Sequence, residues 1–406
     1  MRSRHLAITS ALSLLLAPLV IADDWAGYRG PEGAGRSAES NLLSEWPSDG
    51  PTELWRATIG GGYSGLTVAG ERVYTLSSRG RDEVAIALDA ASGETVWQVR
   101  LDENRSDDQG DGPRSTPTVD GDLVYALGAR GKLFALEVGG GFTRWTRDLV
   151  DDFGAPIPRW GVSTSPLVEG DLLIVDVGGR SGHSLVAFDK LTGEVRWTSG
   201  GDKPGYSTPV AVTIGSVRQI VSFSGTELIS ANAATGELLW RHPWSTSYDV
   251  NAAMPVFLPP NRIFISSSYD TGATVLEIAS SPDGFQVRPS WKSRVMKNHF
   301  NSSVLVDGFL YGFDNGTLKC VDPASGDEKW AARGFAKGSL LYADGKLVIL
   351  SERGVLALAE ADPGEYTERS RFQVFKTKTW TMPTLANGRL FVRDQSELIA
   401  LDLREQ

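Results

Sequence analysis

Few residues in this sequence have the type and spacing that catalytic chemistry requires. After the first 22 residues there are three histidines, His183, His242 and His299, and they lack the paired spacing of metal ligands. The segments GGYSG (61–65) and GRSGHS (179–184) do not complete the G-x-S-x-G turn of a serine hydrolase. We therefore predict no catalytic residues and no metal ligands, and the sequence favours a protein that binds over one that catalyses.

Residues suited to binding recur at one point of a repeated unit, just before its first strand. These segments, which we name the first-strand loops, are 62–64, 112–114, 159–161, 205–207, 248–251, 298–301, 335–337 and 378–380. Convergent aromatic, cationic and amide side chains are typical of a shallow binding site. The predicted ligand- or partner-binding residues are Tyr63, Arg114, Trp160, Tyr206, Asn251, His299, Asn301 and Trp380. The alternative is that they only fill a channel or cap the ends of sheets.

The repeated unit that positions these loops is marked by tryptophan. Segments such as AIALDAASGETVW and LVAFDKLTGEVRW end at Trp97 and Trp197, and equivalent tryptophans follow at intervals of 39 to 52 residues. The interval fits four short strands per unit, as in the blades of a propeller. We interpret the tryptophans of this position as blade core, not as a cofactor stack: Trp55, Trp97, Trp145, Trp197, Trp240, Trp291 and Trp330.

A recurring turn precedes most of these tryptophans, with Asp89, Asp189, Asn232 or Asp322 at its start and a glycine four residues later. Asp and Asn side chains bond to their own backbone two residues on, and glycine readily takes the positive φ that closes a hairpin. The pattern predicts that the third and fourth strands of each unit are joined by this turn.

Eight units can be counted, beginning near Ser64, Ser115, Ser163, Ser207, Asn251, Ser302, Gly338 and Thr381. The seventh has Phe372 or Phe375 where the tryptophan is expected, and the eighth ends after three strands. The missing strand is available at 53–58, and pairing it there leaves no open edge in the ring. The predicted fold is all-β: an eight-bladed β-propeller of four-stranded antiparallel blades, closed by an N-terminal strand that completes the last blade.

The N-terminal 22 residues form a predicted secretory signal peptide, with two arginines before an apolar run and small residues at the cleavage site. Residues 23–51 form an arm that either lies over the surface or plugs the channel, and 52–406 form the propeller. We expect a periplasmic or secreted protein, a monomer with no integral membrane segment after removal of the leader. The net charge of −10 argues against nucleic acid as a partner. The one cysteine, Cys320, is interpreted as a buried thiol.

The Asp-x-x-Thr-Gly-Glu-x-x-Trp turns resemble those of pyrroloquinoline quinone (PQQ)-like β-propeller repeat proteins over residues 53–403. One branch, the quinoprotein alcohol and sugar dehydrogenases, carries PQQ and calcium, and its alcohol dehydrogenases use an adjacent-cysteine disulfide. A single cysteine cannot supply that disulfide, and no acidic calcium set can be matched here. The other, non-catalytic branch contains the outer-membrane assembly factor BamB. It is similar in size, leader and blade number, although the chain has no cysteine before Cys320 for a lipid anchor.

From this resemblance we expect a BamB-like binding or scaffold protein, leaning towards no enzymatic activity and no cofactor, whose first-strand loops contact a protein or a small ligand. Two alternatives remain open. One is a PQQ-dependent alcohol or sugar dehydrogenase with calcium, and the other is a protein that binds or processes carbohydrate through the same aromatic side chains.

Overall fold

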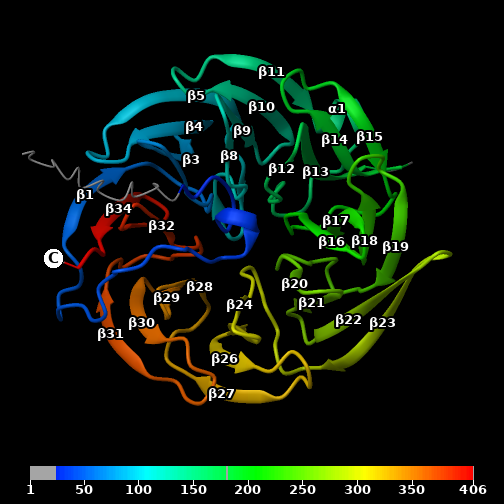
Figure 1. Ribbon diagram of the computed structural model, residues 1–406. Coiled ribbons are helices and arrows are strands. Elements are labelled where there is room, and N and C mark those ends of the chain that lie inside the picture. The colour runs from blue at the N-terminus through cyan, green and yellow to red at the C-terminus, as the bar shows by residue number, and fades with distance from the viewer. Residues whose placement is uncertain (1–23, 180–181, 406) are drawn as a thin grey trace, which may run out of the picture.

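The computed structural model describes residues 24–179 and 182–405, so the predicted signal peptide lies outside the described residues. Figure 1 shows the strands arranged as a ring of sheets around a centre that the N-terminal arm crosses. The described chain forms eight four-stranded sheets and one two-stranded sheet. Neighbouring strands within each sheet are antiparallel. The predicted eight-bladed propeller is therefore confirmed.

The first four blades follow the chain in order, with the innermost strand first and the outermost last. Their strands are β2 (Thr67–Ala69), β3 (Arg72–Arg79), β4 (Asp82–Asp89) and β5 (Thr95–Glu103); β8 (Thr118–Asp120), β9 (Leu123–Leu127), β10 (Lys132–Glu137) and β11 (Thr143–Asp148); β12 (Leu167–Glu169), β13 (Leu172–Gly179), β14 (His183–Asp189) and β15 (Val195–Ser199); β16 (Val210–Ile214), β17 (Val217–Phe223), β18 (Glu227–Asn232) and β19 (Leu238–Pro243).

The remaining blades continue the same order until the last one. Their strands are β20 (Val256–Leu258), β21 (Arg262–Ser267), β22 (Gly272–Ser281) and β23 (Gly284–Ser293); β24 (Val304–Val306), β25 (Phe309–Asp314), β26 (Thr317–Val321) and β27 (Glu328–Ala332); β28 (Gly338–Ala343), β29 (Lys346–Ser351), β30 (Val355–Glu360) and β31 (Glu368–Gln373); and β32 (Thr384–Ala386), β33 (Arg389–Arg393) and β34 (Glu397–Asp402), completed by β1 (Glu53–Thr58).

Three small elements lie outside the blades. The two-stranded sheet pairs β6 (Ser106–Asp107) with β7 (Gly110–Asp111) in the connection between the first two blades. The 3-10 helix η1 (Pro31–Gly33) belongs to the arm, and the short helix α1 (Leu149–Phe153) follows β11. The Asp148 side chain accepts from the backbone N–H groups of Val150 and Asp151 and so caps α1.

The predicted closure of the ring by the two chain ends is confirmed by the pairing of their strands. β1 pairs with β34, with Trp55 opposite Ala400 and Thr58 opposite Glu397. Elsewhere, the residue that starts the last turn of a blade donates its backbone N–H across that turn, as Asp89 does to Glu94 O at 2.8 Å. Asp402 makes the same bond to Thr52 O at 2.9 Å, although no peptide connects them. The two ends together therefore reproduce the hairpin that the chain omits.

The turn chemistry follows the sequence pattern. The Asp89 carboxylate accepts from the backbone N–H groups of Ala91 (3.0 Å) and Ser92 (2.9 Å), and Asp189, Asn232 and Asp322 make the corresponding bond two residues on. The glycine of each turn, Gly93 for example, has a positive φ of 74°. These bonds fix the third and fourth strands as a pair.

The repeated tryptophans join one blade to the next. In six blades the indole Nε1–H donates to a backbone carbonyl beside the last turn of the following blade. The bonds are Trp55 to Ala90 (3.0 Å), Trp97 to Val138 (2.9 Å), Trp145 to Lys190 (3.1 Å), Trp197 to Ala233 (3.1 Å), Trp291 to Pro323 (2.8 Å) and Trp330 to Asp362 (2.7 Å). Trp240 instead donates to Gln219 Oε1 of its own blade at 2.8 Å, because the next blade replaces the tight turn with the long β22–β23 hairpin.

These rings also pack against the turn glycine of the next blade. A Cβ on Gly93, Gly193 or Gly236 would lie 2.5 to 2.7 Å from the ring of Trp55, Trp145 or Trp197. In the seventh blade Phe372 takes the tryptophan's place, and Gly50, which precedes β1, packs against it in the same way with a Cβ distance of 2.5 Å. Glycine is thus required at this turn by both its φ and the approaching ring.

The arm plugs one end of the channel and then continues across neighbouring blades, combining the two predicted alternatives. Trp25 pairs with Val68 of β2 and is only 2% exposed. Arg36 then bridges to Tyr342 of β28, and Leu42 bridges to Arg404 beyond β34. In Figure 1 the arm is the blue segment that carries η1 across the middle of the ring.

The ring–glycine contact makes a stability prediction with a matched control. Gly236→Ala places a methyl group against Trp197, whereas Gly170→Ala occupies a turn with a similar φ of 58° and no atom within 4 Å. Both substitutions carry the backbone cost of a left-handed alanine, about 1–2 kcal/mol. Gly236→Ala should lose about 1–3 kcal/mol more through overpacking. Urea unfolding measures the difference, and equal losses would show that the contact is unimportant.

Candidate functional site

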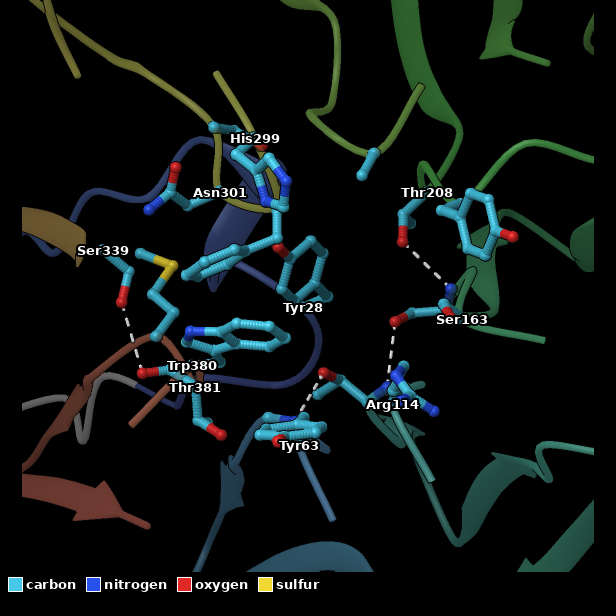
Figure 2. A pocket seen from close by; sticks show the side chains of 18 of the residues that line it. Tyr28, Tyr63, Arg114, Ser163, Thr208, His299, Asn301, Ser339, Trp380 and Thr381 are labelled. Atoms are coloured by element: carbon cyan, nitrogen blue, oxygen red, sulfur yellow. Dashed lines mark hydrogen bonds between the residues drawn. The ribbon is translucent and has the colours of Figure 1, made fainter. Parts of the chain in front are cut away.

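A cavity of about 280 Å³ lies in the channel, between the first-strand loops and the arm. Every blade and the arm contribute to its wall, so no single repeat determines its chemistry. The residues that line it are Tyr28, Arg29, Tyr63, Gly65, Gln109, Arg114, Thr116, Trp160, Ser163, Ser165, Tyr206, Thr208, Val250, Ala252, Tyr269, His299, Phe300, Asn301, Ser302, Lys337, Ser339, Leu340, Trp380, Thr381 and Met382. Figure 2 shows ten of them labelled, with Trp380, Ser339 and Thr381 on one side of the cavity and Ser163 and Thr208 on the other.

The arm closes the cavity with Tyr28 and Arg29. The Arg29 guanidinium is fully buried and is held by carbonyl oxygens alone, among them Ser302 O at 3.0 Å and Ser303 O at 2.8 Å. Burial lowers its pKa to about 10, so it stays a cation at neutral pH. The arm therefore contributes a positive charge as well as a plug.

One side of the wall is a row of hydroxyl groups that links successive blades. Gly65 N–H donates to Thr116 Oγ1 at 3.0 Å, Thr116 N–H to Ser165 Oγ at 2.9 Å, and Ser165 N–H to Thr208 Oγ1 at 2.9 Å. These hydroxyls satisfy backbone donors where the inner strands begin. They are structural acceptors, and none of these bonds involves a base that would make the hydroxyl a nucleophile.

The facing side is aromatic and centres on Trp380. Its ring lies 5.1 Å from that of Tyr63 and 4.9 Å from that of Phe300, between centroids. Trp380 Nε1–H donates to Glu352 Oε2 at 2.9 Å, which fixes the indole plane. The ammonium groups of Lys378 and Lys337 lie 4.3 and 5.8 Å from its centroid, within the range of cation–π attraction.

Arg114 is held at the rim by a nearly buried ion pair. Its Nη2 lies 2.9 Å from Asp107 Oδ1, with the two side chains 12% and 9% exposed. The guanidinium also lies 5.4 Å from the ring centroid of Tyr63. The β6–β7 hairpin brings Asp107 there, so an element outside the blades orients a predicted site residue.

His299 is a neutral base in this environment. Burial and the neighbouring Lys337 ammonium lower its pKa to about 4. Lys337 Nζ lies 3.5 Å from His299 Nε2. An ammonium group can only donate, so Nε2 is the acceptor and the ring proton resides on Nδ1.

The structure brings seven of the eight predicted residues to this one cavity: Tyr63, Arg114, Trp160, Tyr206, His299, Asn301 and Trp380. It does not bring Asn251 there. The Asn251 amide donates to Ser224 O at 2.8 Å and Gly225 O at 3.1 Å, and its oxygen accepts from Ser267 at 2.7 Å, so the side chain is fully buried in a blade. Ligand binding by the other seven stays a prediction.

Other lining residues were not predicted, and their positions explain why. Tyr28 and Arg29 come from the arm, whose path across the channel the repeat does not encode. Tyr269 follows β21, on a turn outside the first-strand loops. Lys337 lies within the seventh first-strand loop, but the repeat does not show that it lies beside His299 and Trp380 in the cavity wall. The clearest sequence signal missed was Gly-Tyr-Arg-Gly at 27–30.

The quinoprotein alternative implies PQQ with calcium, and the wall does not fit that ion. Calcium takes several oxygen ligands, usually including carboxylates. The lining residues include Arg29, Arg114 and Lys337 but no Asp or Glu. Among the described residues no group of three or more His, Cys, Asp or Glu side chains is arranged to hold a metal, and no helix is long and apolar enough to cross a membrane.

Calcium should accordingly leave any interaction with PQQ unchanged. Calorimetric titration of the purified protein with PQQ, with and without 1 mM calcium, should give the same heats, and calcium alone should not raise the melting temperature. Calcium-dependent binding of one PQQ per chain would contradict this expectation and favour the dehydrogenase alternative.

The protonation of His299 gives a second prediction. Between pH 6.5 and about 4 the unfolded chain binds a proton at this residue and the folded chain does not, so its contribution to stability falls as the pH falls. His299→Gln should lose less stability than the wild type between pH 7 and pH 5, measured by urea unfolding. NMR titration should show the His299 ring uncharged at pH 5, and a midpoint near 6.5 would refute the assignment.

Comparison with known proteins places the chain among related propellers. A family model described as outer membrane protein assembly factor BamB matches residues 36–158, 81–332 and 314–405. The BamB of Burkholderia pseudomallei (strain K96243) is 24% identical over 355 residues, covering 84% of this chain and 85% of the relative.

Two solved structures share the fold at low sequence identity. BamB from Moraxella catarrhalis superimposes with a TM-score of 0.63 at 14% identity, covering 86% of this chain and 99% of that one. A quinohemoprotein alcohol dehydrogenase from Comamonas testosteroni gives 0.65 at 12% identity, covering 95% and 81%. The resemblance to BamB and to the quinoprotein fold is confirmed. Because the family matches together run from residue 36 to 405, this chain belongs to the family of outer membrane protein assembly factor BamB.

Proposed function

We propose that this protein is a non-catalytic scaffold of the cell envelope that acts in outer membrane protein assembly by holding a partner protein against the first-strand loops. The family and its BamB relatives support the process. The predicted leader peptide and the same relatives support a periplasmic location.

The observation that carries the proposal is an aromatic patch at the rim of the channel. Tyr248 is 61% exposed, and its ring packs 5.3 Å from that of Tyr269, which lies 5.6 Å from that of His299. On the neighbouring loops Trp160 packs 5.8 Å from Tyr206, whose backbone N–H donates to Asn251 O at 3.0 Å. Tyrosine and tryptophan supply much of the binding energy of protein interfaces. The chain itself leaves this patch accessible.

Ion pairs border the aromatic patch. Lys203 Nζ lies 2.8 Å from Asp249, and Arg159 lies 3.2 Å from Asp108, which also accepts from Trp160 Nε1 at 2.8 Å. An apolar centre with a charged border is the usual composition of a protein interface. The bond to Asp108 also explains how Trp160 keeps its orientation while partly exposed.

The proposal predicts a loss of function when the aromatic patch is removed. In a strain of the source organism that lacks the gene, the variant Trp160→Ala/Tyr248→Ala/Tyr269→Ala should restore less than about half of the wild-type level of outer membrane β-barrel proteins, since hot-spot residues dominate affinity. Quantitative mass spectrometry of the envelope measures this level.

The matched control removes exposed apolar side chains elsewhere. Phe142→Ala/Leu191→Ala alters residues that are 71% and 63% exposed, in the β10–β11 and β14–β15 turns, and should restore the full level. The amount of each variant in the cell is measured alongside. Full restoration by the rim variant at normal abundance would refute the proposal.

A further inference from the structure

The connections between blades differ in charge around the ring. Because the strands within a blade alternate in direction, each of these connections lies on the face of the first-strand loops. The first four connections hold seven acids and four cations, whereas the next three hold six cations and no acid. The first four are 104–117, 149–166, 200–209 and 244–255, and the next three are 294–303, 333–337 and 374–383. We name the last three the basic sector.

The basic sector is a continuous part of the ring. Its connections follow one another between β23 and β32, in the yellow to orange part of Figure 1. The chain as a whole has a net charge of −10, so the sector is an exception to the overall charge.

The two groups of connections also differ in how their cations are paired. In the first four, Arg114, Arg159 and Lys203 each form an ion pair with an aspartate of the same face. In the basic sector only Lys297 is paired, with its Nζ 3.5 Å from Asp314 Oδ1. The other five make no ion pair within the described residues, and they are Arg294, Arg333, Lys337, Lys376 and Lys378. The basic sector therefore keeps its positive charge available.

A shallow groove of about 750 Å³ lies in this sector, between the seventh and eighth blades. It is lined by Glu352, Arg353, Gln373, Lys376, Thr377 and Lys378. Arg353 and Lys376 are exposed. Glu352 is the one acid of the groove, and its two oxygens accept from Trp380 Nε1 at 2.9 Å and from the Lys337 backbone N–H at 3.3 Å. Three cations against one carboxylate leave the groove positively charged.

Hydrogen bonds hold the two walls of the groove together. The Gln373 side chain donates to Arg353 O at 2.6 Å, and the Val374 backbone N–H donates to Gly354 O at 2.9 Å. The Thr379 backbone N–H donates to Glu352 O at 3.1 Å. The 352–354 turn and the 374–380 loop are therefore fixed to each other, and a groove that is already formed loses less entropy when it binds a partner.

The sector lacks the apolar side chains of a membrane-binding surface. Interfacial binding combines cations with apolar groups that enter the lipid. The large exposed hydrophobic residues of the described chain all lie elsewhere: Leu54, Val96, Phe142, Ile157, Leu191, Val195, Leu238 and Tyr248. The groove is instead continuous with the channel, because Lys378 and Lys337 lie 4.3 and 5.8 Å from the ring centroid of Trp380. These observations favour a protein segment over a lipid surface.

We propose that this groove binds an acidic segment of the partner protein. Carboxylates of the segment pair with Arg353, Lys376 and Lys378, since ionised donors and acceptors make strong hydrogen bonds. The acid-rich connections on the rest of the face repel the same segment, so charge determines how the partner is oriented. The proposal rests on the proposed function for the partner being a protein, whereas the groove can be tested without it.

A model peptide tests the chemistry of the groove. A decapeptide of alternating Asp and Gly, blocked at both ends, should bind the purified protein in calorimetric titration at about 20 mM salt, and less tightly at about 150 mM because salt screens exposed charges. The corresponding Asn-Gly peptide should bind at least tenfold more weakly. Equal affinities for the two peptides, or no binding of the acidic one at millimolar concentration, would overturn the proposal.

Two double variants with the same change in charge locate the binding site. Arg353→Glu/Lys376→Glu should weaken binding of the acidic peptide at least tenfold. Arg288→Glu/Lys329→Glu reverses two exposed cations on the outermost strands β23 and β27, which also lack ion pairs, and should weaken it less than threefold. Equal weakening by both would show that only net charge matters and would refute the assignment.

Thermal melting establishes that each variant is folded. If the charge reversal prevents folding, Arg353→Gln/Lys376→Gln removes the same two charges and should weaken peptide binding at least threefold. Unchanged affinity in that folded variant would count against the groove.

Vesicles distinguish a protein segment from a membrane. The purified protein should sediment equally little with phosphatidylglycerol and with phosphatidylcholine vesicles. Sedimentation with phosphatidylglycerol that is lost in Arg353→Glu/Lys376→Glu would assign the groove to lipid and overturn the proposal. Because these experiments use isolated protein and model ligands, their failure would leave the complementation test of the aromatic patch unaffected.

Discussion

The packing of a tryptophan from one blade on the last turn of the next is the contact on which the ring depends. An isolated four-stranded blade cannot bury both faces and has an open outer edge. The indole buries apolar surface against a turn glycine and donates to a carbonyl beside it, as Trp197 does with Gly236 and Ala233. One side chain thus provides both apolar contact and a directional bond. The fifth blade has the long β22–β23 hairpin in place of the tight turn. Trp240 of the fourth blade therefore donates to Gln219 of its own blade instead.

This outer framework leaves the inner surface free to vary. The ring is secured by tryptophans on its outermost strands, whereas the cavity is made by short inner strands and the loops before them. Each blade contributes only a few residues to the wall. A BamB and a quinohemoprotein alcohol dehydrogenase can therefore share this fold with the chain at 14% and 12% identity. The same framework supports a wall of cations, hydroxyls and rings here.

The sequence was sufficient to predict the repeat because its determinants are local. The Asp89 turn, the glycine and the tryptophan lie within nine residues, and each has a physical reason to occur there. The site was harder to predict because its determinants are not local. Asn251 occupies a first-strand loop, yet its amide is used within the blade. Arg29 reaches the cavity from an arm some 270 residues away in sequence from the carbonyls of Ser302 and Ser303 that hold it. The pairing of Lys337 with His299 also appears only in three dimensions.

The hairpin assembled from two chain ends has a consequence for the order in which the protein matures. Strand β1 and the arm are synthesised first, but their partners, β34 and Arg404, are synthesised last. Until then the three inner strands of the last blade, β32 to β34, are missing, Trp55 has no strand to pair with, and the ring remains open between its first and last blades. Final folding must therefore wait for the C-terminus. A chain that is still emerging from the ribosome therefore cannot complete its native ring.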